Sequence, residues 1–369
     1  MMANTPNVIF IGSFIDEAKD GSVGGQMFAC RSILNSQISA RVNFLLIDST
    51  VDTVPIPPLS KRFFKIFPRF FLLFKYLLTK KVDKVLIFSS TGPSFIEKGL
   101  AVIVCKLFFK KVIFAPCSGL MKDAVKKSAL FRSYVRFILR ISDKVICQSE
   151  SWKVFYKNIY SRNDQKFIVI LNWIDLHEYI ENNPVYHNKS DHAHMLLFLG
   201  WIEEYKGIFD LIEAINLIKD KISGLKVDIY GSGKAEKLAV KKCRDYGLQH
   251  ICIFKGRANQ VVRFEALASA DFYVLPSHAE GFPNALLEAM ASGLPSIASN
   301  VGGVSEIIIT NKTGMLVEPG DVVALSQAIY ELYSNKELRA ELSMNGRNKI
   351  IEKNSLEIAE KKFIGLLLN

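Results

Sequence analysis

The stretch that decides the fold is Asp271–Gly303, which reads DFYVLPSHAEGFPNALLEAMASGLPSIASNVGG. An apolar run ends at Pro276, a loop of small and polar residues follows, and a helical pattern begins at Pro283 and stops at Gly293. Proline suits the first position of a helix, where its missing N–H is not needed, and glycine commonly follows the last turn. The stretch therefore predicts a strand, a loop and a helix, and then a further strand at Ser296–Ala298.

The same alternation of short apolar runs and longer helical patterns extends through the whole chain. The expected strands of the first half are Val8–Ile11, Val42–Ile47, Val85–Phe88, Val112–Phe114, Val145–Cys147 and Phe167–Ile170. Those of the second half are Met195–Leu199, Val227–Tyr230, Ile251–Phe254, Phe272–Leu275 and Ser296–Ala298. Strands that are apolar throughout and are joined by helices indicate parallel sheets covered on both faces. Two such sets in series predict an α/β protein with two doubly wound domains.

The length of 369 residues also suggests two domains. We expect an N-terminal Rossmann-like domain over residues 1–180 and a C-terminal one over residues 195–353. Residues 181–194 contain Asn, Pro and His without apolar periodicity, which is the composition of a linker. A helical segment at residues 354–369 has no strand to follow it, and we expect it to pack near the N-terminal domain.

Two glutamates in the deciding stretch suggest a binding site. Glu280 lies in the loop before the expected helix, and Glu288 lies inside that helix. The start of a helix offers free N–H groups and the positive end of its dipole to an anion. A nucleotide sugar would fit, with its phosphates on the N–H groups, its ribose on Glu288 and its sugar near Glu280. The alternative is an ordinary strand–loop–helix with two solvated glutamates, and spacing alone does not decide between the two.

The segment EGFPNALLEAMASGLP, with its E-x7-E pattern from Glu280 to Glu288, resembles the retaining glycosyltransferases of family 4 (glycosyl transferases group 1), which have the GT-B fold. FLGWIEEYKG at 198–207, VDIYGSG at 227–233 and FKGR at 254–257 resemble further patterns of the family in the same order. The resemblance implies two Rossmann-like domains facing across a cleft, with the nucleotide sugar on the C-terminal domain and the acceptor on the N-terminal one. It also implies hexosyl transfer with retention from a nucleotide-diphosphate donor to a saccharide or lipid-linked saccharide, in cell-surface polysaccharide assembly.

The resemblance also implies roles for individual residues. Glu280 would face the donor sugar at the reaction centre, Lys206 would contact the diphosphate, and Glu288 would hold the ribose. Further donor contacts are expected at Gly24, Gly25, Phe282, Pro283, Asn284, Ala285 and Arg257. The sequence departs from the family pattern at Trp201, where the family usually has Arg, and at Pro116–Ser118, where it often has a nearby His.

Motifs that the sequence lacks argue against several other classes of protein and site. No D-x-D motif occurs, so we expect neither a metal ion nor any other cofactor. No G-x-G-x-x-G follows the first strand, which argues against a dinucleotide oxidoreductase. Two alternatives stay open, namely another GT-B reaction such as nucleotide-sugar epimerisation and a catalytically inactive GT-B-like subunit that binds a partner.

Charge is distributed unevenly along the chain. Residues 1–190 carry a net charge of +13, whereas residues 191–369 carry −2. The segment KRFFKIFPRFFLLFKYLLTKK at Lys61–Lys81 interleaves Lys and Arg with Phe and Leu, as segments that lie in an anionic membrane interface do. An amphipathic helix with a basic solvent face is the alternative. No nucleic-acid-binding motif accompanies the charge, so we expect no nucleic-acid partner.

Localisation is predicted from the cysteines and the apolar runs. None of the six cysteines forms a C-x-x-C pair, which suggests a reducing compartment. The N-terminal apolar run has no positive segment ahead of it, unlike a signal peptide. No run of about 18 apolar residues is free of charge. We therefore expect a cytoplasmic protein, peripheral on the inner face of the cytoplasmic membrane.

Overall fold

A computed structural model describes residues 5–15, 24–50, 59–161, 165–182 and 194–368. The chain forms two compact units, which we call unit 1 (Met1–Asn172 with Leu356–Asn369) and unit 2 (Trp173–Ser355). The division falls after Asn172 rather than at residue 180, because helix α7 (Leu176–Asn182) packs on helices of unit 2. Most of the expected linker at 181–194 lies outside the described residues.

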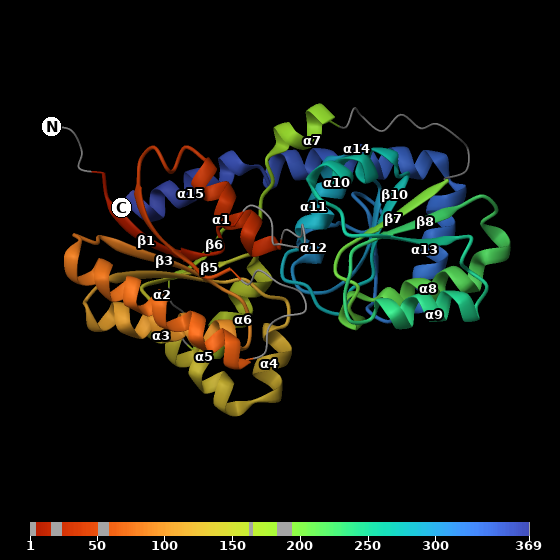
Figure 1. The fold of residues 1–369 in the computed structure, drawn as a ribbon. Coiled ribbons are helices and arrows are strands. Elements are labelled where there is room, and N and C mark those ends of the chain that lie inside the picture. Colours follow the sequence, from red (N-terminus) through yellow and green to blue (C-terminus); the bar gives the residue numbers. More distant parts are fainter. Residues whose placement is uncertain (1–4, 16–23, 51–58, 162–164, 183–193, 369) are drawn as a thin grey trace. The chain divides into compact units, whose positions relative to one another are not determined.

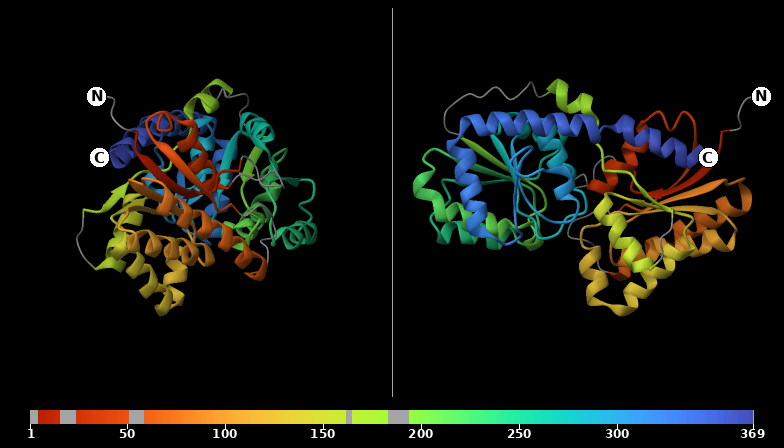
Figure 2. Two further views of the ribbon diagram at one scale, coloured as in Figure 1. Left: turned by 60° about the vertical axis from the view of Figure 1, so that its left-hand side comes forward. Right: turned by 180° about the vertical axis from the view of Figure 1, so that it is seen from behind.

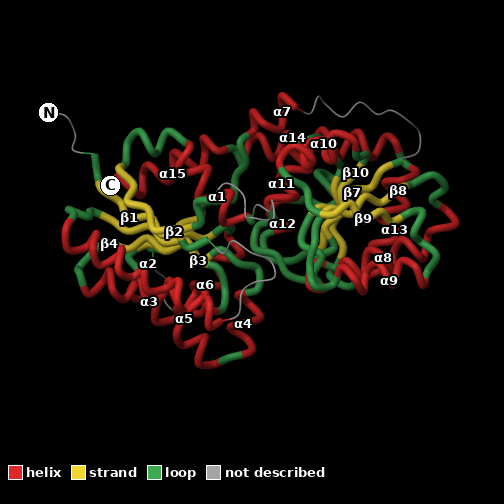
Figure 3. The backbone as a smooth tube through the Cα atoms, in the orientation of Figure 1, coloured by secondary structure: helices red, strands yellow, loops and turns green. Residues whose placement is uncertain are grey.

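Unit 1 is built on six parallel strands (Figures 1 and 3). In spatial order they are β2 (Asn43–Asp48), β1 (Asn7–Gly12), β3 (Lys84–Ser89), β4 (Lys111–Pro116), β5 (Lys144–Cys147) and β6 (Phe167–Val169). The order reverses between β1 and β3, so the loops that follow these two strands diverge to opposite faces of the sheet. In such sheets ligands bind at this carboxyl edge.

Helices cover both faces of the unit 1 sheet, because alternate residues of each strand point to opposite sides. Residues such as Ile9 and Ile11 share one core with the helices of the first face. These are α2 (Leu59–Thr79), α3 (Pro93–Leu107), α4 (Met121–Lys127), α5 (Ala129–Ile141) and α6 (Glu150–Tyr160). Helices α1 (Gly25–Asn35) and α15 (Leu356–Leu368) cover the other face (Figures 1 and 2).

Helix α15 is joined to unit 1 by both apolar and polar contacts. The ring of Phe363 stacks on that of Phe88, with centroids 6.5 Å apart. Lys84 Nζ donates to the carbonyl of Leu366 at 2.9 Å, and Lys362 Nζ donates to that of Val169 at 3.0 Å. The chain therefore returns to complete unit 1 after it has formed unit 2.

Unit 2 also holds six parallel strands. Their order is β12 (Met315–Val317), β11 (Ser296–Ser299), β10 (Phe272–Leu275), β7 (Met195–Leu199), β8 (Lys226–Tyr230) and β9 (Cys252–Gly256). The order reverses between β7 and β10, which lie side by side. The predicted pair of doubly wound α/β sheets is thus confirmed, and the loops after β7 and β10 meet at the reversal point.

The helices of unit 2 form two layers (Figure 1). On one face lie α8 (Ile208–Ile218), α9 (Glu236–Asp245) and α13 (Val322–Ser334). On the other lie α10 (Gln260–Ser269), α11 (Asn284–Ala291) and α14 (Lys336–Lys353). The short helix α12 (Val304–Ile307) follows β11, and the 3₁₀ turns are η1 (Glu204–Lys206) and η2 (Lys219–Lys221). Within the described part of the chain, no helix has both the length and the apolar character needed to cross a bilayer.

Candidate active site

An ion pair lies at the reversal point of the unit 2 sheet. Turn η1, after β7, carries Lys206, and the loop after β10 carries Glu280. Lys206 Nζ lies 2.6 Å from Glu280 Oε1, and the buried Ser277 hydroxyl donates to the same oxygen at 2.7 Å. Only 7% of Glu280 is exposed. The structure therefore brings together the two residues to which the sequence assigned catalytic roles, and it adds Ser277 to them.

The electrostatics of this pair keep Lys206 charged. Burial alone would lower the pKa of Lys206, but the charge and hydrogen bond of Glu280 together with Tyr205 outweigh burial and raise that pKa above its usual value. Tyr205 lies next to the pair, with its ring centroid 5.5 Å from Lys206 Nζ. Burial raises the pKa of Tyr205, so its hydroxyl is neutral at neutral pH. The pair is thus a protonated amine against a carboxylate in a largely desolvated place.

Two glycines allow the neighbouring loops to pack closely against the loop that carries Glu280. Gly207 has φ +72°, and a Cβ there would lie 1.8 Å from the carbonyl oxygen of Pro276. Gly302 has φ +59°, and a Cβ there would lie 1.9 Å from the carbonyl oxygen of Glu280. Only glycine combines a left-handed backbone with so close an approach. The loops after β7, β10 and β11 are therefore in backbone contact around Glu280.

Glu288 lies in the second turn of α11 and is 3% exposed. Arg263 of α10 places Nη1 3.2 Å from Glu288 Oε1 and 3.5 Å from Oε2. The hydroxyl of Tyr179, on α7, also faces Glu288. The pKa of Tyr179 is raised well above its usual value, mainly by burial and also by the Glu288 carboxylate. Both glutamates are thus buried and paired, so the alternative of two solvated glutamates is wrong.

The buried ring of Tyr273 lies near both glutamates. Tyr273, in the middle of β10, donates its hydroxyl to the carbonyl of Leu199 at 3.3 Å. Burial raises the pKa of Tyr273 well above its usual value, and both Glu280 and Glu288 add to that rise. Both carboxylates therefore lie within electrostatic range of the same phenol.

The residues expected to contact the donor after Glu280 lie at the start of α11. Phe282 is buried, and Pro283 precedes the helix in an extended conformation. The helix begins at Asn284, one residue later than predicted, and Ala285 follows in its first turn. Pro283 supplies no side-chain cap to the N-terminus of α11. The positive end of the α11 dipole directly follows the loop that carries Glu280.

Arg257 follows β9 and reaches across to the loops after β7 and β8. Its Nε donates to Ser232 Oγ, and its guanidinium carbon lies 6.0 Å from the ring centroid of Trp201. Trp201 is the position where the resembling family usually has Arg. In this protein an arginine from another loop stands over the tryptophan, so a cation is present near this place despite the substitution.

Gly24 and Gly25 lie in unit 1. Gly24 precedes α1 with φ −81°, and Gly25 is the first residue of that helix. A Cβ at Gly24 would meet no atom of the described residues within 4 Å. Neither the backbone conformation nor the packing of unit 1 therefore requires glycine at residue 24, which leaves its expected role toward a donor as a prediction.

Sequence reasoning assigned no role to Ser277, Arg263, Tyr179 or Asp210, and the last of these, on α8, pairs with His278 of the loop that carries Glu280. His278 Nε2 lies 2.6 Å from Asp210 Oδ2, and the His278 backbone N–H donates to the carbonyl of Tyr205 at 2.8 Å. Ser277 stands in the predicted loop three residues before Glu280, so its place in the loop was a usable signal. Nothing in the spacing of Arg263 or Tyr179 pointed to Glu288.

Comparison with known proteins agrees with this geometry. Residues 180–349 match the family described as Glycosyl transferases group 1. The chain is 32% identical over 225 residues to the uncharacterized glycosyltransferase MJ1178 of Methanocaldococcus jannaschii, which covers 60% of this chain and 59% of that protein. It is 26% identical over 302 residues to the capsular polysaccharide biosynthesis glycosyltransferase CapM of Staphylococcus aureus, which covers 76% of this chain and 78% of CapM.

Solved structures show the same fold at low sequence identity. Sucrose-phosphate synthase from Thermosynechococcus elongatus superposes with a TM-score of 0.81 at 20% identity over 98% of both chains. HepE from Anabaena, in complex with UDP-glucose, gives a TM-score of 0.74 at 16% identity over 98% of this chain and 99% of HepE. These are glycosyltransferases of GT-B type. The chain thus has the fold of GT-B glycosyltransferases, and its residues 180–349 match the glycosyl transferases group 1 family.

Proposed function

We propose that this glycosyltransferase moves a hexose from a nucleotide-diphosphate donor to a saccharide or lipid-linked saccharide, with retention of configuration. The observation that carries the proposal is the ion pair between the half-buried Lys206 and the buried Glu280, which lies where the strand order of unit 2 reverses. A doubly wound sheet binds its ligand at this place. HepE, which shares the fold, was solved with UDP-glucose, and this supports a nucleotide sugar as the donor.

Lys206 and the N-terminus of α11 would together hold the donor diphosphate. The bond between the sugar and the diphosphate breaks during transfer, and negative charge then grows on the leaving diphosphate. A protonated amine and a helix N-terminus stabilise this charge more strongly in the transition state than in the ground state. Glu280 would stabilise the positive charge that develops on the sugar. Because the sequence has no D-x-D motif, we propose that this chemistry needs no metal ion.

Glu288 would accept hydrogen bonds from the ribose of the donor. Its carboxylate has about four lone-pair directions, and Arg263 uses mainly Oε1. After the contacts of Arg263 to both oxygens and of the Tyr179 hydroxyl, an oxygen lone pair remains for a ribose hydroxyl. Arg257 would border the base, and Gly24 and Gly25 would let the backbone of unit 1 approach the donor. Phe282, Pro283, Asn284 and Ala285 would surround the phosphate or the sugar.

The acceptor side would involve unit 1. CapM is a glycosyltransferase of capsular polysaccharide biosynthesis, and this supports a role for the present chain in cell-surface polysaccharide assembly. Residues 61–166 carry a net charge of +17, which favours an anionic surface as partner. We therefore place the protein at the inner face of the cytoplasmic membrane, where a lipid-linked acceptor would be presented.

A two-step experiment tests the proposal. Thermal shifts with UDP-, GDP- and ADP-sugars identify the donor, because a ligand at 100 times its Kd adds ~2.7 kcal/mol to the free energy of unfolding. Release of nucleoside diphosphate with candidate acceptors then measures transfer, and NMR of the product gives its anomeric configuration. Conversion of the sugar without diphosphate release would indicate an epimerase. A thermal shift without turnover on any acceptor would indicate a binding subunit.

A further inference from the structure

Helix α2 exposes a continuous row of large apolar side chains. Phe64 and Phe71 expose 74% and 72% of their surface, and Phe67, Phe74 and Leu78 are also exposed. Successive members of this row are three or four residues apart, so they lie on one face of the helix. Leu73 and Leu77 are buried against the sheet on another face. The helix is thus apolar on two faces, whereas a surface helix normally has one apolar stripe.

The end of α3 extends this row. The ring of Phe108 packs edge-on against that of Phe74, with centroids 6.0 Å apart. On either side of Phe108, Leu107 is exposed and Phe109 exposes 95% of its surface. Phe109 has φ +56°, a left-handed conformation that costs energy for an aromatic residue. We call the set Phe64, Phe67, Phe71, Phe74, Leu78, Leu107 and Phe109 the α2–α3 apolar surface.

The charged residues beside this surface indicate which kind of partner binds to it. Helix α2 contains no acidic residue. Lys75 is exposed one helical turn after Phe71, and Lys65 is exposed directly after Phe64. Lys80 and Lys81, just beyond the helix, are exposed too. A second copy of this face would bring lysines against lysines, whereas an anionic lipid surface would neutralise them while its acyl region takes up the rings.

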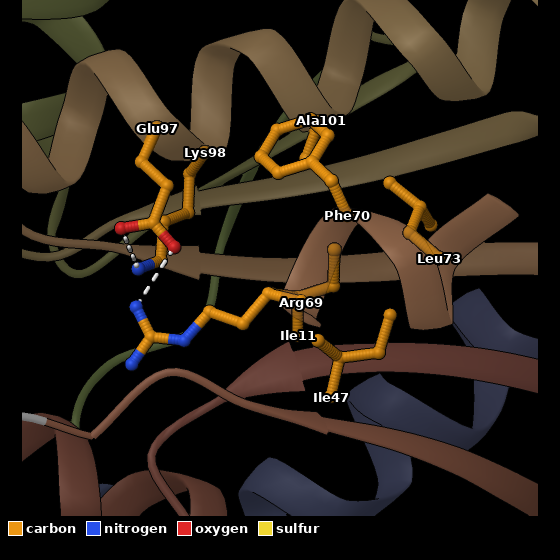
Figure 4. Close-up of a pocket in the computed structure, with 8 residues that line it drawn as sticks. All are labelled: Ile11, Ile47, Arg69, Phe70, Leu73, Glu97, Lys98 and Ala101. Atoms are coloured by element: carbon orange, nitrogen blue, oxygen red, sulfur yellow. Dashed lines mark hydrogen bonds and ion pairs between the residues drawn. The ribbon is translucent and has the colours of Figure 1, made fainter. Parts of the chain in front are cut away.

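Arg69 has a different role from Lys65 and Lys75 of the same helix (Figure 4). It points inward, with Nη1 3.0 Å from Glu97 Oε1, and its Nε donates to the carbonyl of Asp48 at 3.0 Å. Lys98 Nζ lies 3.4 Å from the other oxygen of Glu97. These groups line a pocket together with Ile11, Ile47, Phe70, Leu73 and Ala101. Arg69 therefore joins α2 to α3 and to the end of β2, and it holds the aromatic row outward.

We infer that the α2–α3 apolar surface docks unit 1 on an anionic bilayer, with its phenylalanine rings inserted and its lysines beside the headgroups. The inference deepens the proposed function and rests on it in one respect, since docking would serve a lipid-linked acceptor. The end of β2, to which Arg69 holds α2, is at the carboxyl edge of the sheet, where a ligand of unit 1 would bind. Docking through α2 would bring that edge close to the lipid headgroups.

Vesicle co-sedimentation of the full chain tests the inference, with phosphatidylcholine vesicles compared with vesicles that also contain phosphatidylglycerol. We expect binding to the mixed vesicles. The triple variant Phe64→Ser, Phe67→Ser, Phe71→Ser should lower the partition coefficient at least tenfold at both low and high salt, because apolar insertion is lost. The variant Lys65→Glu, Lys75→Glu should lose binding mainly at low salt, where charges are screened least.

Two exposed apolar residues of unit 2 provide the matched control. Leu238→Ser and Val261→Ser remove side chains that are 62% and 64% exposed on α9 and α10, and they should leave vesicle binding unchanged. All variants should keep the parent's thermal shift with the donor sugar, which shows that they fold and keeps this test separate from the proposed function. Undiminished binding by the triple variant, or no binding by the parent, would overturn the inference. A dimer of the parent that the triple variant abolishes would assign the surface to a second copy instead.

Discussion

At the scale of single residues, Glu280 is the most direct test of the site. Glu280→Gln keeps the shape of the side chain but removes the charge that faces Lys206 and, in the proposed mechanism, the sugar. We expect kcat to fall about 10²-fold or more, with nucleoside diphosphate affinity nearly kept. Initial rates and calorimetric titration measure the two quantities. Glu318→Gln, at an exposed residue that pairs with Asn300, serves as the control. An unchanged kcat in Glu280→Gln would remove Glu280 from the chemistry.

Lys206 is expected to act in place of a metal ion. Lys206→Ala should lower kcat strongly, and the parent should keep its activity in EDTA. Because Glu280 holds the pKa of Lys206 above its usual value, this amine stays protonated as the pH rises through the ordinary lysine range. Its contribution to stability is complete below the pKa of an unfolded lysine and is lost only above its own raised pKa. Loss of activity in EDTA, restored by Mg²⁺ or Mn²⁺, would refute the metal-independent site.

Arg263 should matter for stability as well as for the donor. Arg263→Met leaves Glu288 buried without its cation, and such a loss costs about 3–5 kcal/mol. Tyr179→Phe removes one hydrogen-bonding group and should cost about 1 kcal/mol. Urea unfolding measures both changes, and nucleotide titration at low urea shows whether Glu288 still binds the ribose. If Arg263→Met were as stable as the parent, the Arg263–Glu288 pair would make no net contribution to stability.

The sequence indicated only half of this residue-level arrangement. Glu280, Lys206 and Glu288 stand in recognisable patterns, and in the structure both glutamates are buried and paired with a cation, Lys206 in the case of Glu280. Arg263 is 25 residues from Glu288 in the sequence. Tyr179 lies near the start of unit 2, still farther from Glu288. Their meeting depends on how α7, α10 and α11 pack, and no local spacing encodes that packing.

At the scale of elements, the glycines provide a paired experiment. Gly207→Ala would place a Cβ 1.8 Å from the carbonyl of Pro276 at a positive φ, so it should destabilise unit 2 by more than the ~1 kcal/mol of backbone strain alone. It should also lower kcat, since η1 would have to shift with Lys206. Gly365→Ala, in α15 with no atom within 4 Å of the new Cβ, should stabilise by about 0.5–1 kcal/mol. Thermal unfolding measures the change in stability of both variants. Equal changes would contradict the close packing of the loops around Gly207.

Strands were predicted best where polar or turn residues bound the apolar run on both sides. The expected bounds of β7 and β10 match the structure, and most other strands differ by one or two residues at an end. Strand β12 has three residues and no clear run, and α7 reaches into a segment of linker composition. The aromatic residues of Lys61–Lys81 could not be sorted by pattern alone. Phe70 packs inward while Phe64, Phe67 and Phe71 face solvent, a choice made by the position of the sheet.

At the scale of the whole molecule, α15 is needed for unit 1 to be complete. Phe363→Ala removes a ring that is 1% exposed and stacked on Phe88, and such a truncation costs about 3–5 kcal/mol. Unit 1 should then unfold at lower urea concentration, while unit 2 keeps its affinity for the nucleotide. Hydrogen exchange followed by mass spectrometry separates the two units. The control is Leu368→Ala, which removes an exposed side chain of the same helix. Protection lost equally in both units would show that they unfold together.

The return of the chain to unit 1 also has a consequence for biosynthesis. Roughly 180 residues of unit 2 are translated between the first segment of unit 1 and α15. At ~5–20 residues per second this takes about 10–40 s. Throughout that interval the face of the sheet that Phe363 and Leu367 cover is open on the ribosome-bound nascent chain, and its strands present Phe88 to chaperones or to neighbouring nascent chains. The first unit to be synthesised is therefore the last to finish folding.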